Sequence, residues 1–99
     1  MNNKIYSIDE IKKRFEKVAR KYEINEAYLF GSYARGDATR ESDVDFYINK
    51  GKIRGWDLYG FYDEVENVMN KKVDFITTAT ALDGEFEAEM RKDLVKIYG

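Results

Sequence analysis

Residues 31–46 have the sequence GSYARGDATRESDVDF, and the fold and chemistry expected of the chain both depend on this stretch. It follows a short apolar run, opens with Gly-Ser, and ends with Asp43 and Asp45 in a β-branched and aromatic setting. On a strand, residues two apart point to the same face of the sheet. We therefore expect Asp43 and Asp45 to project together, with the geometry of a paired-carboxylate clamp for a metal ion.

The two aspartates favour a magnesium site over a solvated strand face. Aspartate is depleted in strands, and two carboxylates on one face repel each other unless a cation lies between them. Carboxylate oxygens suit Mg²⁺, which recruits its remaining ligands from water and substrate phosphates. A third acid, Asp74, lies in the run Val73–Thr77 and could reach the same metals if its strand lies beside the strand of Asp45.

Gly31 and Ser32 stand between an expected strand and a helical turn, which makes them candidates for binding phosphate. Glycine lets the backbone approach a ligand closely, the first amides of a helix attract anions, and the Ser32 hydroxyl adds a donor. A Gly-Ser pair at the end of a strand is nevertheless more often a simple turn. The prediction that Gly31 and Ser32 bind phosphate therefore depends on the two aspartates that follow them.

The composition limits the other chemistry that the chain can perform. Its 99 residues suit one domain, and 43% are hydrophobic and 36% charged. Cysteine and histidine are absent, which excludes disulfides, thiolate nucleophiles and imidazole acid–base chemistry. A formal charge of −2 with scattered basic residues disfavours long nucleic acids as ligands. Since no signal core or run of membrane length is present, we expect a cytoplasmic protein.

The pattern of apolar residues predicts helices and strands along the whole chain. Spacings of three and four residues predict long helices over residues 7–22, 56–70 and 82–91, with Trp56 among the apolar positions. Short aromatic and β-branched runs predict strands over residues 26–30, 43–48 and 73–77, with a helical turn at 33–36. The first two strands should be antiparallel, because a parallel crossover needs a longer connection. Residues 94–98 fit either a continued helix or an edge strand, and we expect the strand.

The spacing Gly-Ser-x-Ala-x-Gly followed by Ser-Asp-x-Asp resembles the signature of the DNA polymerase β-type nucleotidyltransferase superfamily. The small size and the stretch GKIRGWDLYGFYDEVENVMNKKVDF are similar to the minimal nucleotidyltransferase (MNT) proteins, the MntA-type antitoxin partners of HEPN-type toxins. With the predicted elements, the resemblance implies a single α+β domain over residues 1–99. We expect a small mixed sheet of three to four strands with helices packed on it.

The resemblance also implies roles for seven residues. Asp43 and Asp45 would hold two Mg²⁺ ions, and Asp74 would bind metal as well and act as the base toward the acceptor hydroxyl. These three would be the catalytic residues. The substrate would be ATP, whose triphosphate would be bound by Gly31 and Ser32 and, as phosphate or loop-ordering contacts, by Arg35 and Ser42.

The reaction implied by the resemblance is transfer of AMP from ATP to a hydroxyl, that of a tyrosine, on a cognate HEPN-type toxin. The chain would then be an antitoxin in a hetero-oligomer with that toxin. Two alternatives stay open. The chain could neutralise its toxin by binding alone, with the nucleotide site merely structural, or it could transfer the nucleotidyl group to a small molecule.

Overall fold

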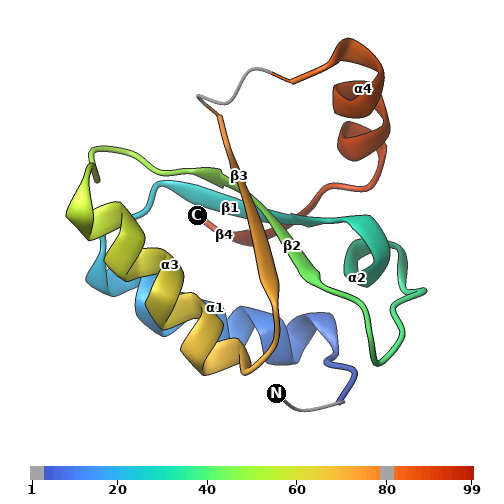
Figure 1. Cartoon of the computed structure of the whole chain (residues 1–99), viewed down its shortest axis with the longest axis horizontal. Helices are drawn as coiled ribbons and strands as arrows, with labels where there is room; N and C mark the ends of the chain where they lie inside the picture. The colour runs from blue at the N-terminus through green and yellow to red at the C-terminus, as the bar shows by residue number, and fades with distance from the viewer. Residues whose placement is uncertain (1–3, 79–81) are drawn as a thin grey trace.

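The computed structural model describes residues 4–78 and 82–99. The elements follow in the order α1 (Ile8–Lys21), β1 (Glu26–Phe30), α2 (Gly31–Arg35), β2 (Val44–Asn49), α3 (Trp56–Met69), β3 (Val73–Thr77), α4 (Gly84–Lys92) and β4 (Val95–Tyr98). In these ranges four strands form one mixed sheet in the order β3-β2-β1-β4 (Figure 1). β1 is antiparallel to β2 and β4, whereas β2 and β3 are parallel. The expected α+β class and the antiparallel first pair of strands are confirmed.

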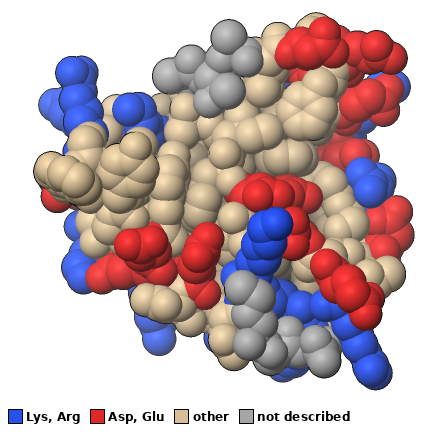
Figure 2. All heavy atoms as spheres, in the orientation of Figure 1, with Lys and Arg blue, Asp and Glu red and all other residues tan. Residues whose placement is uncertain are grey.

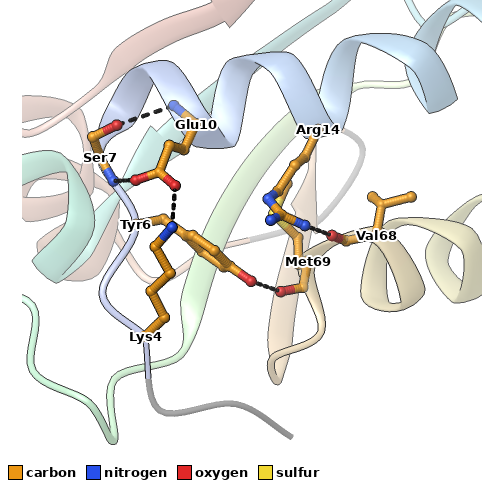
Figure 3. A network of polar contacts seen from close by, with 7 residues as sticks. All are labelled: Lys4, Tyr6, Ser7, Glu10, Arg14, Val68 and Met69. Carbon is orange, nitrogen blue, oxygen red and sulfur yellow. Dashed lines mark hydrogen bonds and ion pairs between the residues drawn. The ribbon is translucent and has the colours of Figure 1, made fainter.

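The capping box predicted at the start of the first helix is present. The Glu10 amide donates to Ser7 Oγ at 3.1 Å, and the Ser7 amide donates to Glu10 Oε1 at 3.1 Å (Figure 3). This pair of bonds satisfies two amides that have no partner within the helix. α1 therefore begins at a defined point and presents one apolar face, which buries Ile11, Phe15, Val18 and Ala19.

Two side chains from the N-terminal part of the chain hold the end of α3. The Tyr6 hydroxyl donates to the Met69 carbonyl at 2.6 Å, and the Arg14 guanidinium donates to the Val68 carbonyl at 2.7 Å (Figure 3). The last carbonyls of a helix lack partners within the helix, so these bonds satisfy groups that would otherwise need water. They fix α1 and α3 side by side.

α1 and α3 cover one face of the sheet and enclose the main core. Val44, Phe46 and Ile48 are fully buried on that face, as the alternation along β2 predicts. The Phe46 ring stacks on Phe15 with 4.9 Å between centroids, and Phe15 meets Phe61 of α3 at 5.9 Å. Residues 45 and 47 must then face the other side of the sheet.

α4 packs over that other face. A smaller apolar cluster there contains Phe30, Tyr47 and Met90, which come from β1, β2 and α4. The cover is partial, and it leaves space over the first residues of β2. No helix among the described residues is long and apolar enough to cross a membrane.

Some predicted boundaries differ from the structure. β2 begins at Val44, so Asp43 precedes the strand; the helical turn expected at residues 33–36 is α2 and begins at Gly31. The third long helix begins at Gly84 rather than at residue 82, because the Asp83 side chain caps it by accepting from the Phe86 amide. The ambiguous tail is the strand β4, paired antiparallel with β1, which confirms the expectation.

The placement of Trp56 among the apolar positions of its helix was wrong. Its side chain is 88% exposed, whereas Phe61, Val65 and Met69 of the same helix are buried. Trp56 is the first residue of α3, and the buried residues of this helix begin only at Phe61. A spacing of three or four residues predicts which face of a helix is apolar, but not how far along the helix the core continues.

Candidate active site

The parallel pairing of β2 and β3 brings Asp45 and Asp74 together. The two residues are direct partners in the register, so their side chains leave the same face of neighbouring strands. The shared metal site predicted from the sequence depended on these two strands being neighbours, which the sequence itself could not show. Asp43 lies two residues before Asp45, and its Oδ2 is 3.9 Å from Lys72 Nζ. The pair therefore forms the centre of the site, and Asp43 lies at its edge.

The carboxylate of Asp45 is electrostatically strained in the absence of a cation. The pKa of Asp45 is raised from 3.8 to about 6, and the largest cause is the partial burial of its side chain. The negative charges of Asp74 and Asp43 contribute to the same rise, while Arg35 acts in the opposite direction. A divalent cation would relieve both the burial cost and the repulsion, so the arrangement favours a bound metal.

Gly31 lies directly against this carboxylate. Its φ is +71°, and a Cβ atom built on it would lie 2.4 Å from Asp45 Oδ2. A side chain at this position is therefore disfavoured for two reasons: the left-handed backbone conformation, and the overlap of its Cβ atom with Asp45 Oδ2. The sequence suggested that Gly31 makes room for a ligand. The structure adds that it makes room for the acidic residue at the other end of the motif.

The rest of the Gly-Ser turn is the short helix α2. Ser32 is its second residue, and its carbonyl accepts from the amides of Gly36 and Asp37, both at 3.0 Å. Gly36 ends the helix in the left-handed conformation with a φ of +85°. Ser32 is thus fixed just after β1, beside Gly31, although it is not among the residues that line the pocket at the carboxylates.

Arg35 and Ser42 form hydrogen bonds that fix the segments around the site. Arg35 Nε donates to Asp37 at 3.1 Å, and its Nη1 donates to Asp93 at 3.1 Å. Because Asp93 is the C-cap of α4, this ion pair connects α2 with the helix over the sheet. Ser42 Oγ accepts from the Thr39 amide at 2.8 Å and so orders the loop before β2.

A pocket of about 590 Å³ opens between the sheet and α4. The sequence-predicted residues Gly31, Arg35, Asp45 and Asp74 all line it. The remaining lining was not assigned from the sequence; it comprises the apolar Phe30, Phe75, Ile76, Phe86 and Met90 and the acidic Glu89 and Asp93. One signal for α4 existed, since Phe86 and Met90 are four residues apart with acids between them, but that spacing equally describes a helix in the core.

The donor set fits magnesium held jointly by protein and substrate. Within residues 4–78 and 82–99, no three side chains of metal-binding type stand close enough together to form a ready-made metal site. Mg²⁺ does not need one, because it keeps water ligands and binds through one or two carboxylates together with substrate phosphates. Asp45 and Asp74, beside an open pocket, supply such carboxylates.

A mixed α+β sheet with two paired carboxylates and a glycine turn against them is the arrangement of a nucleotidyltransferase domain. Residues 10–99 match the family model described as "Polymerase beta, Nucleotidyltransferase". The chain belongs to this family and is a nucleotidyltransferase. A relative from Methanocaldococcus jannaschii named "Putative protein adenylyltransferase" is 35% identical over 72 residues, which cover 72% of this chain and 77% of the relative.

Solved structures show the same fold. One is a toxin-antitoxin with AMP-PNP; it matches with a TM-score of 0.72 and 19% identity over 89% of this chain and 73% of that one. Another is a tri-AMPylated HEPN toxin of Shewanella oneidensis in complex with an MNT antitoxin; it matches with a TM-score of 0.66 and 15% identity over 93% and 72% of the two chains. At these identities the likeness establishes the fold.

Proposed function

We propose that the chain uses Mg²⁺ to transfer AMP from ATP to a tyrosine hydroxyl of a HEPN-type toxin, and that it thereby acts as an antitoxin. The observation that carries the proposal is the carboxylate pair Asp45 and Asp74 with Gly31 pressed against it. The name of the M. jannaschii relative supports a protein acceptor. The toxin complexes among the similar structures support its class.

The residues of the site divide the work of phosphoryl transfer. Asp45, Asp74 and Asp43 would hold two Mg²⁺ ions, which would neutralise charge on the transferring group and on the leaving pyrophosphate. The amides and hydroxyl of the Gly31–Ser32 turn would bind the triphosphate. Asp74 would accept the proton of the acceptor hydroxyl, since the chain has no histidine for this task.

The acceptor can reach this site from outside. Asp74 is exposed on β3, which is at the edge of the sheet in the described part of the chain. The pocket beside it is open to solvent and combines carboxylates with an apolar wall from α4. A tyrosine has an apolar ring and a polar hydroxyl, so it matches both parts of this lining.

The test is transfer of label from α-labelled ATP to a HEPN-type toxin purified with the chain. The wild-type chain should label the toxin, and EDTA should stop the reaction. Asp45→Asn and Asp74→Asn should each abolish labelling, because each removes a carboxylate from the pair. Asp63→Asn is the matched control, since Asp63 is an exposed aspartate of α3 outside the pocket.

The same proteins separate the enzyme from an antitoxin that only binds. An enzyme should neutralise the toxin at substoichiometric amounts, and the Asp45→Asn variant should not. Undiminished labelling by both aspartate variants would overturn the proposal. So would full neutralisation by these variants, at a stoichiometry no different from that of the wild-type chain.

A further inference from the structure

The start of α3 exposes two aromatic side chains that the fold does not use. Trp56 is 88% exposed and Tyr59 is 63% exposed, more than the other exposed large hydrophobic residues of the described ranges, Ile5 and Phe86. They lie one turn apart on the helix, with 6.1 Å between ring centroids. Tryptophan and tyrosine are among the residues that most often carry binding energy in protein interfaces.

Two cations lie beside this aromatic pair, in the loop that precedes α3. Lys52 and Arg54 are exposed, and among residues 4–78 and 82–99 no carboxylate lies within ion-pair distance of either. Lys21, at the end of α1, differs from them, because its Nζ pairs with Glu64 Oε1 at 2.6 Å. We call Lys52, Arg54, Trp56 and Tyr59 the α3 docking surface.

A hollow adjoins the α3 docking surface. It has a volume of about 640 Å³, and Lys52, Ile53 and Asp57 form one side of it. The other side comes from the end of α1 and the turn after it, with Lys21, Tyr22, Glu23 and Asn25. The surface therefore offers both protruding aromatic rings and a recess into which a side chain of a partner could fit.

The α3 docking surface lies far from the catalytic pocket. β2 begins beside Asp45 and ends before the loop that leads to α3, and its six residues span roughly 20 Å. Figure 1 shows the start of α3 at one side of the molecule and α2 and α4 at the other. Acidic side chains gather over α4 at that far side (Figure 2). The cationic loop and the acidic catalytic side thus differ in charge.

The charges around the surface decide which occupant fits. α3 carries Asp57 between the two aromatic residues and Asp63, Glu64 and Glu66 after them, so a nucleic-acid backbone laid along the helix would meet repeated negative charge. A second copy whose two-fold axis passes through the loop would bring the same cations close to one another. A short acidic segment of another protein that contacts Lys52 and Arg54 in the loop, and does not continue along α3, meets neither obstacle.

We propose that the exposed Trp56 and Tyr59, with Lys52 and Arg54 beside the adjoining hollow, bind an acidic segment of the protein acceptor and hold it while a distant part of that acceptor reaches the catalytic pocket. The inference rests on the proposed function, because the acceptor is the protein that receives AMP. It adds to that function a second contact, remote from the chemistry, which determines which protein is modified.

The experiment measures binding and transfer separately with the purified full chain and the HEPN-type toxin. Trp56→Ala should raise the dissociation constant by about tenfold or more, as loss of an interface anchor does. The double variant K52E/R54E should weaken binding as well and reduce its dependence on salt. At saturating toxin, the transfer rate of both variants should stay at the wild-type value, because neither change touches the pocket.

Two controls make the result specific. Ile5→Ala removes another exposed apolar side chain, 48% exposed, and should leave binding unchanged. Asp45→Asn should bind toxin like the wild-type chain while losing transfer. We therefore expect Asp45→Asn to bind toxin normally and lose transfer. We expect Trp56→Ala to bind toxin weakly and keep the normal maximal rate of transfer.

The docking proposal is overturned if Trp56→Ala binds toxin like the wild-type chain, or if Ile5→Ala weakens binding as much. It is also overturned if Trp56→Ala instead abolishes self-association in size-exclusion chromatography or binding of a single-stranded uridine-rich RNA. Undiminished transfer by Asp45→Asn together with weak binding by Trp56→Ala would overturn the catalytic proposal alone. The two failures are therefore distinguishable.

Discussion

Replacing Asp45 with Asn should stabilise the metal-free protein even though it should abolish activity. Asp45 is partly buried next to two other carboxylates, and its pKa is raised from 3.8 to about 6, first by burial and then by Asp74 and Asp43. A carboxyl group whose pKa is higher in the folded state than in the unfolded state destabilises the fold when it is ionised. Asparagine keeps the shape of the side chain and removes this charge.

The size of the effect follows from the two pKa values. A rise from 3.8 to about 6 corresponds to about 3 kcal/mol once the group is fully ionised. The unfavourable contribution is complete above pH 6 and shrinks as the pH falls through 6 toward 3.8, reaching about half at pH 5. Since solvent and side-chain relaxation absorb part of the cost, we expect Asp45→Asn to gain roughly 1–3 kcal/mol at pH 8 and about half as much at pH 5.

Urea unfolding in the presence of EDTA, at pH 8 and at pH 5, measures this gain. Asp63→Asn serves as the control, because Asp63 is an exposed aspartate of α3 and its substitution should change stability little. Added Mg²⁺ and a non-hydrolysable ATP analogue should stabilise the wild-type chain and not the Asp45→Asn variant. A variant less stable than wild type at pH 8, or a gain of the same size at both pH values, would refute the electrostatic reasoning.

Three further substitutions test other parts of the structure. Gly31→Ala should remove nucleotide binding in a thermal-shift assay, because the new Cβ atom would lie 2.4 Å from Asp45 Oδ2. Gly36 has a similarly positive φ, but a Cβ atom there would have nothing within 4 Å, so Gly36→Ala should keep nucleotide binding. Equal loss of binding in both variants would contradict the steric argument. Tyr6→Phe loses the 2.6 Å bond to the end of α3 and should cost about 1 kcal/mol in urea unfolding; no change would mean that water replaces the bond. Ser7→Ala removes the helix cap and should also cost about 1 kcal/mol, which Ser7→Asp should largely restore.

Local sequence patterns predicted most of the fold. The capping box at Ser7 and the apolar spacing after it define where α1 begins and which face it buries, and both depend on residues within four positions of each other. The alternation in β2 likewise determines that Phe46 faces the core and Asp45 the opposite side. These features are visible in the sequence because the residues that cause them are near neighbours in the chain.

The completed site depends on contacts between distant residues. Asp45 and Asp74 meet because β2 and β3 are parallel neighbours joined through α3, and no local pattern specifies which strands are adjacent. Arg35 was expected at the phosphates or in loop ordering, and the structure shows it bonded to Asp93 at the end of α4. The apolar wall from α4 was missed because its spacing is the same as that of a core helix.

A crystal of the chain grown with Mn²⁺ and a non-hydrolysable ATP analogue would test the central claim most directly. We predict anomalous density for the metal against the carboxylates of Asp45 and Asp74, with the triphosphate at Gly31 and Ser32. Crystals of Asp45→Asn grown in the same way should lack that density. Metal and triphosphate bound elsewhere on the protein, or unchanged density in the variant, would contradict the account.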